Sequence, residues 1–240
     1  MGFNTKIPIV NDGLTYYLDA GNNKSYPTSG TVITNLVDET NVGTLLNGVS
    51  FDSSNVGSLV LDGTNQYIQV GTQSSIQFLD EFSINIWAYC NSDLSTTTPE
   101  TISGKGNPNN TSPNLVIYFR GTASYNGIAP FISSTGGATN FFLRPDTDLS
   151  DEVANNWSNI CVTRSFDDWR LYYNGNLVDQ KTDVTSGRVV NNTSHYLRLG
   201  VKESGSYMDG NIGVYSIYGN KTLTAEEVLQ NYNALKYRYK

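Results

Sequence analysis

The stretch "WRLYYNGNLVDQK", residues 169–181, contains the clearest local structural signal in the chain. Its central pair, Asn174-Gly175, lies between two runs that are rich in apolar and aromatic residues. A two-residue Asn-Gly loop is typical of a type I′ β-hairpin, because both central residues of that turn need a positive φ. The stretch therefore predicts two antiparallel strands and a fold that is built on antiparallel sheet.

A second stretch, "EFSINIWAYC", residues 81–90, alternates between apolar and other side chains. Because successive side chains of a strand point to opposite faces, the alternation predicts a strand with one fully apolar face. That face carries Phe82, Ile84, Ile86, Ala88 and Cys90. The opposite face also carries aromatic side chains, so we expect it to be partly covered.

Comparable short runs recur between clusters of Gly, Asn, Ser and Thr, and only 15% of the residues are charged. The number of such runs, about a dozen, predicts an all-β fold, a two-sheet antiparallel jelly-roll sandwich. The C-terminal stretch "LTAEEVLQNYNALKYRYK" differs, because Thr224 and Glu227 have the spacing of a capping box. We expect a short α-helix over residues 224–237, an N-terminal arm over residues 1–13, and one sandwich domain over residues 14–240.

The formal net charge of −7 argues against nucleic acid or an anionic membrane as a partner. No apolar run approaches the roughly 20 residues that span a bilayer. The N-terminus lacks the apolar region of a secretory signal. Cys90 and Cys161 lie in separate strand-like runs, and two buried free thiols are favoured over a disulfide.

The stretch "LVLDGTNQYIQV", residues 59–70, allows two interpretations of Asp62. An Asp-Gly pair between two apolar runs is typical of a hairpin turn. A carboxylate beside the amide oxygen of Asn65 is also half of a plausible calcium site, since calcium prefers oxygen ligands.

Several segments together carry a family resemblance. They are "LTYYLDAGNNKSYPTSGTVITNL", "GTLLNGVSFDSSNVGSLVLDGTNQYIQV", "FSINIWAYC", "NNWSNICVTRS", "RLYYNGNLV", "YLRLGV" and "YMDGNIGVYSIYGNKTLTAEEVLQNY". In order and spacing, from about residue 14 to 237, the chain resembles the concanavalin A-like jelly-roll domains of the laminin-G and pentraxin type. The "LDAGN..SYP" opening and "LT..E..QNY" ending resemble the version in tailed-phage virion proteins.

The resemblance implies a scaffold that binds glycans or proteins, often with calcium at one end. Its two Asp-Gly signatures correspond here to Asp62 and Asp209, so Asp62, Asn65 and Asp209 are the candidate calcium ligands. The alternative is that both aspartates brace turns at strand ends of one sandwich, with no cofactor. For glycan binding, the candidate stacking residues are aromatic side chains in loops: Tyr125, Phe141, Trp169 and Tyr207.

The sequence offers no candidate catalytic residues for an enzymatic role. Glycoside hydrolysis needs two carboxylates facing one cleft, but the strands hold few acids, and the acidic run at residues 146–152 lies in a predicted loop. His195 is the sole histidine, which argues against a catalytic triad.

The resemblance to tailed-phage virion proteins implies, as the leading hypothesis, a non-enzymatic virion surface protein, a phage capsid decoration or fibre domain assembled in the bacterial cytoplasm. Its partners would be other virion proteins and host or environmental glycans. The alternative is a carbohydrate-binding lectin or adhesin module of bacterial origin, at the cell surface or outside the cell. A glycan-cleaving enzyme ranks third. A homo-oligomer is compatible with the composition, although no feature of the sequence specifies one.

Overall fold

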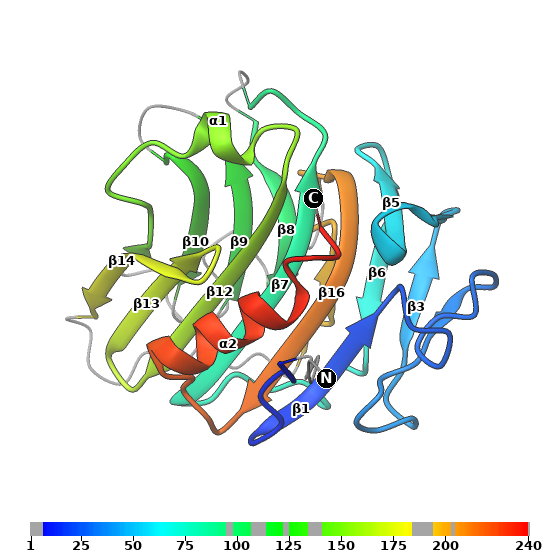
Figure 1. The fold of residues 1–240 in the computed structure, drawn as a ribbon, viewed down its shortest axis with the longest axis horizontal. Helices are drawn as coiled ribbons and strands as arrows, with labels where there is room; N and C mark the ends of the chain where they lie inside the picture. Colours follow the sequence, from blue (N-terminus) through cyan, green and yellow to red (C-terminus); the bar gives the residue numbers. More distant parts are fainter. Residues whose placement is uncertain are drawn as a thin grey trace, which may run out of the picture.

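The protein is a sandwich of two antiparallel sheets with one helix, α2 (Ala225–Leu235), across the outer face of one sheet (Figure 1). The predicted all-β sandwich with a C-terminal helix is confirmed. No described helix is long and apolar enough to cross a membrane. The computed structural model describes residues 7–94, 98–106, 114–121, 125–133, 141–183, 194–202 and 205–239.

The first sheet has eight strands in the order β14-β13-β12-β7-β16-β5-β4, with β1 also beside β16. The first half of β16 pairs with β5 and the second half with β1. The bounds are β14 (Asn176–Thr182), β13 (Asp168–Tyr173), β12 (Trp157–Ser165), β7 (Glu81–Cys90), β16 (Asp209–Gly219), β5 (Ser58–Asp62), β4 (Ser50–Asp52) and β1 (Leu14–Asp19).

The second sheet also has eight strands, in the order β11-β10-β9-β8-β15-β6-β3-β2. Short helical turns, η1 (Ser54–Val56) and α1 (Ser150–Val153), lie in connecting segments. The strand bounds are β11 (Phe141–Phe142), β10 (Gly127–Ser133), β9 (Asn114–Arg120), β8 (Glu100–Lys105), β15 (Leu197–Leu199), β6 (Tyr67–Val70), β3 (Gly43–Leu46) and β2 (Val32–Ile33).

The Asn174-Gly175 hairpin is confirmed. Tyr173 pairs with Asn176, and the two turn residues have φ values of 48° and 82°. These are the positive values that a type I′ turn requires.

The hairpin predicted for residues 59–70 is wrong, because its two strands lie in different sheets. β5 pairs with β16 and β4 in the first sheet, whereas β6 pairs with β15 and β3 in the second. The segment is a corner between the sheets. Both strands turn apolar side chains inward, so the periodic pattern is the same for a hairpin and for a corner.

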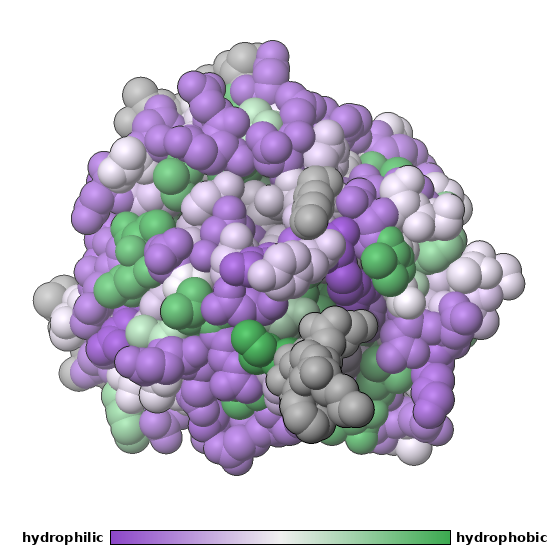
Figure 2. Space-filling view, viewed as in Figure 1, coloured by the Kyte–Doolittle hydropathy of each residue, from purple (hydrophilic) through white to green (hydrophobic). Residues whose placement is uncertain are grey.

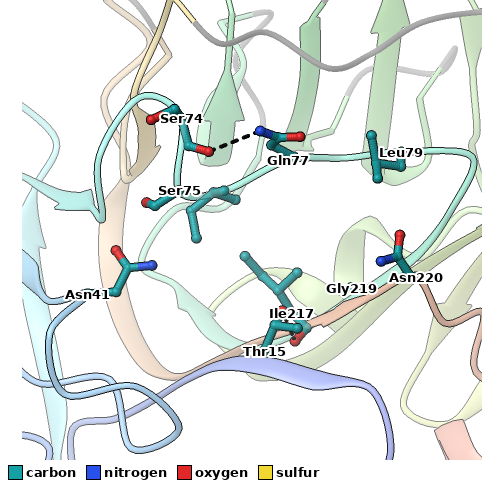
Figure 3. Close-up of a pocket in the computed structure, with 10 residues that line it drawn as sticks. Thr15, Asn41, Ser74, Ser75, Gln77, Leu79, Ile217, Gly219 and Asn220 are labelled. Atoms are coloured by element: carbon teal, nitrogen blue, oxygen red, sulfur yellow. Dashed lines mark hydrogen bonds between the residues drawn. The ribbon is translucent and has the colours of Figure 1, made fainter.

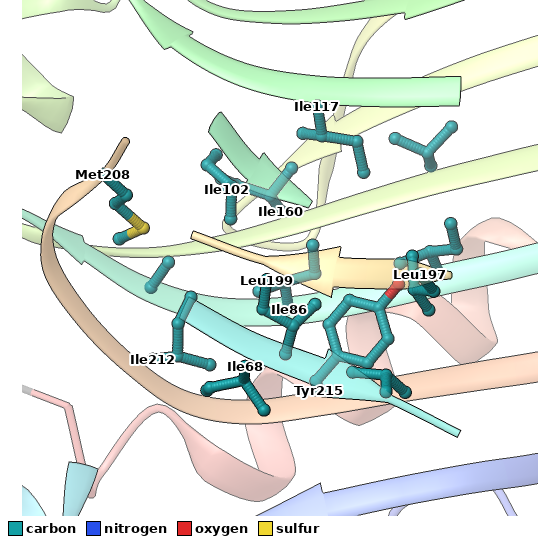
Figure 4. Packing of buried hydrophobic residues seen from close by; sticks show 14 of the residues in the cluster. Ile68, Ile86, Ile102, Ile117, Ile160, Leu197, Leu199, Met208, Ile212 and Tyr215 are labelled. Atoms are coloured by element: carbon teal, nitrogen blue, oxygen red, sulfur yellow. The ribbon is translucent and has the colours of Figure 1, made fainter. Parts of the chain in front are cut away.

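The main core fills the space between the sheets (Figure 4). The predicted apolar face of β7 points into it, and all five of its side chains are buried. Tyr215 also enters this core, where its hydroxyl lies 3.1 Å from Ser103 Oγ and so forms a hydrogen bond within the apolar layer. Since both sheets contribute, neither is stable as a single exposed layer.

Cys90 and Cys161 are free and buried, as predicted. Their strands are neighbours, but Cys161 pairs with Asn85 rather than with Cys90. Cys90 faces the core between the sheets, whereas Cys161 lies on the opposite face with Tyr172 and Tyr218. Burial raises the pKa of Cys90 to about 12 and also raises that of Cys161, so both thiols stay protonated.

The outer face of the first sheet is covered by α2, and the expected partial cover of the second face of β7 is confirmed. Trp87 lies between Tyr232 and Tyr239, with ring centroids 5.7 and 4.7 Å away. The capping box is present, since the Thr224 side chain accepts from Glu227 N–H and the Glu227 carboxylate accepts from Thr224 N–H. Figure 2 shows this side of the molecule as mostly hydrophilic, with hydrophobic side chains in small separate patches.

The two ends of the described chain meet over this face. Residues 7–13 of the predicted arm lie beside α2, where Asn231 accepts from Val10 N–H at 2.8 Å and donates to the Tyr218 hydroxyl at 2.9 Å. Arg238 makes two hydrogen bonds to the carboxylate of Asp19, at 2.7 and 2.8 Å. The division at residue 13 stays a prediction, but residues 7–13 are packed against the sandwich.

We expect Asn231→Ala to lower the free energy of unfolding by about 2 kcal/mol, because it leaves a buried N–H without an acceptor. Urea denaturation measures this value. Asn233→Ala, a half-buried position on the same helix, is the matched control, with an expected change within about 0.5 kcal/mol. Equal effects of the two variants would contradict the role given to Asn231.

Candidate functional site

A pocket of about 260 Å³ lies where β1 begins and β16 ends, under the loop that joins β6 to β7 (Figure 3). The 71–80 loop, as we call this connection, forms one wall, and Asn41 reaches the pocket from the segment before β3. None of the ten described residues that line the pocket is charged. They are Thr15, Asn41, Ser74, Ser75, Ile76, Gln77, Leu79, Ile217, Gly219 and Asn220.

The 71–80 loop is shaped by its own short polar side chains. Thr72 N–H donates to Ser75 Oγ at 2.7 Å, and Ser75 N–H donates to Thr72 Oγ1 at 3.1 Å. Gln77 Nε2 donates to the Ser74 carbonyl at 3.2 Å (Figure 3). Gly71 has a φ of 60°, and a Cβ there would lie only 2.5 Å from Asn41 Oδ1 and Ser75 Oγ. Glycine therefore allows these pocket side chains to approach the backbone.

Two buried cationic side chains, Lys105 and Arg164, donate hydrogen bonds to the backbone of the 71–80 loop. Lys105 has no exposed surface, and its Nζ donates to the Gln73 carbonyl at 2.8 Å. Arg164 donates to the Leu79 carbonyl at 3.1 Å, and its Nη2 lies 3.4 Å from Asp80 Oδ1. Each cation acts near one end of the loop, so the pocket wall is fixed at two points.

Burial lowers the pKa of Lys105 to about 8, because the ammonium form loses its hydration in the interior. The carbonyl of Gln73 is its hydrogen-bond acceptor. A neutral amine still donates a hydrogen bond, so the bond from Lys105 to the Gln73 carbonyl persists when the amine is deprotonated.

Two amides face the pocket with no hydrogen bond to any other described residue. Asn41 and Asn220 point into it from opposite sides in Figure 3. Asn41 Oδ1 is buried and has no partner among the described residues. Each amide offers a carbonyl acceptor and two N–H donors, which matches the mixed donors and acceptors of ligand hydroxyls.

The apolar part of the lining comes from Ile76, Ile217 and Leu79. An apolar surface beside convergent amides suits a small ring that carries hydroxyls on its edge and C–H groups on its faces. The volume lies below the roughly 300 Å³ at which pockets for drug-sized ligands begin. The pocket therefore fits a single ring.

The pocket residues were not predicted from the sequence. They come from four separated segments, and each is a common surface or strand residue, so no spacing motif joins them. The signal that was present is the polar "GTQSSIQ" run, residues 71–77, between two apolar strands.

The four predicted aromatic residues do not form one site. Trp169 has no exposed surface and packs against Phe82 and Phe141 in the core, so it is corrected from a ligand contact to a core residue. Phe141 is half-buried beside it. Tyr125 is half-buried elsewhere, with the guanidinium of Arg120 3.8 Å from its ring centroid. Tyr207 is half-buried before β16, and its ligand role stays a prediction, as does that of Tyr125.

Asp62 and Asp209 are directly opposite each other in neighbouring strands, at the end of the sandwich where β16 begins. The Asp62 carboxylate accepts from the backbone N–H groups of Thr64, Asn65 and Gln66, which lowers its pKa. This is the geometry of a braced turn.

The Asp209 carboxylate accepts from the side chain of Asn91 at 3.1 Å, and its backbone N–H donates to Glu100. Among the described residues, no group of three His, Cys, Asp or Glu side chains could hold a metal ion. Calcium at Asp62, Asn65 and Asp209 stays a prediction, and the structure shows the carboxylate of Asp62 engaged in its turn.

Comparison with known families agrees with this architecture. A laminin-G-type family model, described as the concanavalin A-like lectin/glucanases superfamily, matches residues 62–229. The chain belongs to this superfamily. No protein of curated function matches the sequence.

Three solved structures with a similar fold share 15–19% sequence identity with this chain, and at such low identity the likeness shows the fold alone. Domain 4 of AbnA, an extracellular arabinanase from Geobacillus stearothermophilus, in complex with arabinotriose, has a TM-score of 0.65 at 16% identity, over 91% of this chain and 97% of that chain.

The binding domain of botulinum neurotoxin DC, in complex with rat synaptotagmin II, has a TM-score of 0.72 at 15% identity, over 95% of this chain and 53% of that chain. The binding domain of Paraclostridial Mosquitocidal Protein 1 has a TM-score of 0.69 at 19% identity, over 92% of this chain and 52% of that chain. The chain thus spans about half the length of these two toxin domains.

The lowered pKa of Lys105 predicts that the free energy of unfolding depends on pH. Between pH 8 and the ordinary pKa of 10.5 the unfolded state binds more protons at this residue, so its contribution to stability rises with pH. Lys105→Met lacks this titration. We expect the free energy of unfolding of Lys105→Met, relative to that of the unaltered protein, to fall as pH rises from about 7 to about 10. The fall should reach up to about 1.4 kcal/mol per pH unit.

Chemical denaturation at several pH values measures this difference. Lys24→Met, at an exposed lysine, is the matched control and should show no such trend. A pH-independent difference for Lys105→Met would mean that the folded protein does not disfavour the charged amine.

Proposed function

We propose that this protein is a non-enzymatic, lectin-like domain that binds a neutral glycan in the pocket under the 71–80 loop. The observation that carries the proposal is the uncharged lining, in which the Asn41 and Asn220 amides face the pocket without other described partners. Membership of a lectin and glucanase superfamily supports a sugar as the ligand class. So does the similar fold of a domain solved with arabinotriose.

The same lining supports binding rather than cleavage. Glycoside hydrolysis uses an acid and a second carboxylate on either side of the scissile bond. The ten described lining residues include neither aspartate nor glutamate. Amides and hydroxyls orient a sugar but do not supply this acid and nucleophile.

A glycan array followed by titration calorimetry tests the proposal. We expect binding to neutral glycans, and each of Asn41→Ala and Asn220→Ala should weaken it roughly fivefold through the loss of hydrogen bonds. Tyr125→Ala is the control, because it removes a sequence-predicted contact outside the pocket. If Tyr125→Ala weakens binding and the two asparagine variants do not, the site lies at Tyr125; an array without hits contradicts glycan binding.

We further propose that the domain serves as a capsid decoration or fibre domain on a phage virion surface, after assembly in the bacterial cytoplasm. The support is the resemblance of the opening and ending motifs to virion proteins. A bacterial lectin or adhesin is the alternative, and it uses the same pocket.

Mass spectrometry of purified particles of the encoding phage should detect the protein, and its absence would contradict the virion role. Since residues 7–13 are packed on the sandwich, the attachment test should remove residues 1–6 alone. We expect this deletion to reduce particle occupancy without changing the melting temperature, if the segment is the tether. Unchanged occupancy would rule out the tether.

A further inference from the structure

The turn between β12 and β13 presents an aromatic ring in an unfavourable backbone conformation. Ser165 pairs with Asp168, so Phe166 and Asp167 form a two-residue turn. Phe166 has a φ of 54°, and the residue is 60% exposed. Bulky residues rarely adopt a positive φ, and glycine would fit this position without a steric penalty. An exposed aromatic residue gains little from packing here, so the Phe166 ring is accessible to a ligand.

This turn is bonded directly to the 71–80 loop. Phe166 N–H donates to the Asp80 carbonyl at 2.7 Å. The buried guanidinium of Arg164 joins the same two segments, because it donates to the Phe166 carbonyl at 2.7 Å and to the Leu79 carbonyl at 3.1 Å. The position of Phe166 relative to the pocket loop is therefore fixed by three hydrogen bonds.

Leu79 connects the turn to the pocket. It lines the pocket and is itself 43% exposed. Phe166 does not itself line the pocket, but its turn is hydrogen-bonded to the loop segment that carries Leu79. The other exposed lining residues are polar. The pocket volume of about 260 Å³ leaves room for a single ring, and its described lining includes no aromatic side chain.

We propose that Phe166 and Leu79 form a second subsite, which binds the apolar C–H face of the sugar next to the one held in the pocket. The inference rests on the proposed function and narrows its ligand to neutral oligosaccharides of two or more residues. Hydrogen bonds in the pocket select the first ring. The ring of Phe166 adds affinity for the second sugar, and this contact depends little on which hydroxyls that sugar carries.

The test compares chain lengths by titration calorimetry. The probes are arabinotriose, cellotriose and maltotriose, with arabinose and glucose as the matching monosaccharides. We expect the unaltered protein to bind a trisaccharide roughly tenfold more tightly than its monosaccharide. Phe166→Gly should lose this advantage and keep the monosaccharide affinity, while its melting temperature stays equal or rises because glycine suits the positive φ.

Val56→Gly is a matched control, because Val56 is also 60% exposed with a positive φ of 69° and does not line the pocket. Leu79→Ser is a second, independent variant and should also reduce the preference for trisaccharides. If Phe166→Gly and Leu79→Ser both keep that preference, or if the unaltered protein shows none, the second subsite is wrong while the pocket stands. If the unaltered protein binds no probe of either length, the proposed function fails together with the subsite.

Discussion

The double pairing of β16 is the constraint on which the rest of the structure depends. This strand pairs with β7 along one edge, and along the other it pairs first with β5 and then with β1. Its start, Asp209, therefore lies at the corner with Asp62, and its end, Gly219, lies at the pocket. One strand thus sets the distance between the turn at Asp62 and the candidate binding pocket.

The pairing of β16 with β1 also brings the two ends of the described chain together. Because β1 joins β16, the segment before β1 lies beside the helix that follows β16, and Asn231 bonds to Val10 there. Asp19, at the end of β1, binds Arg238 after the helix. The aspartate of the "LDAGN" opening and the asparagine of the "QNY" ending are therefore structural. The resemblance rests on residues that close the outer face of a sheet, which is why these motifs identify the scaffold better than the ligand.

Local signals predicted those parts of the fold that local physics determines. The alternation in β7, the Asn174-Gly175 turn and the Thr224 capping box were all predicted correctly, because each depends on residues within one element. The segment around Asp62 was predicted as a hairpin because the pattern does not reveal which sheet each strand joins. The pocket was not predicted either, because the amides of Asn41 and Asn220 are far apart in the sequence and only the pairing of distant strands brings them together.

The proposal of a neutral ligand rests on where the charges lie. Lys105 and Arg164 donate hydrogen bonds to backbone carbonyls of the 71–80 loop, and both are buried and absent from the pocket lining. The protein as a whole carries a net charge of −7, which repels an anionic polysaccharide before contact. An anionic sugar that reached the pocket would meet amides and hydroxyls but no cation in the lining. A neutral sugar would meet no such repulsion, which is the physical argument for the proposed ligand class.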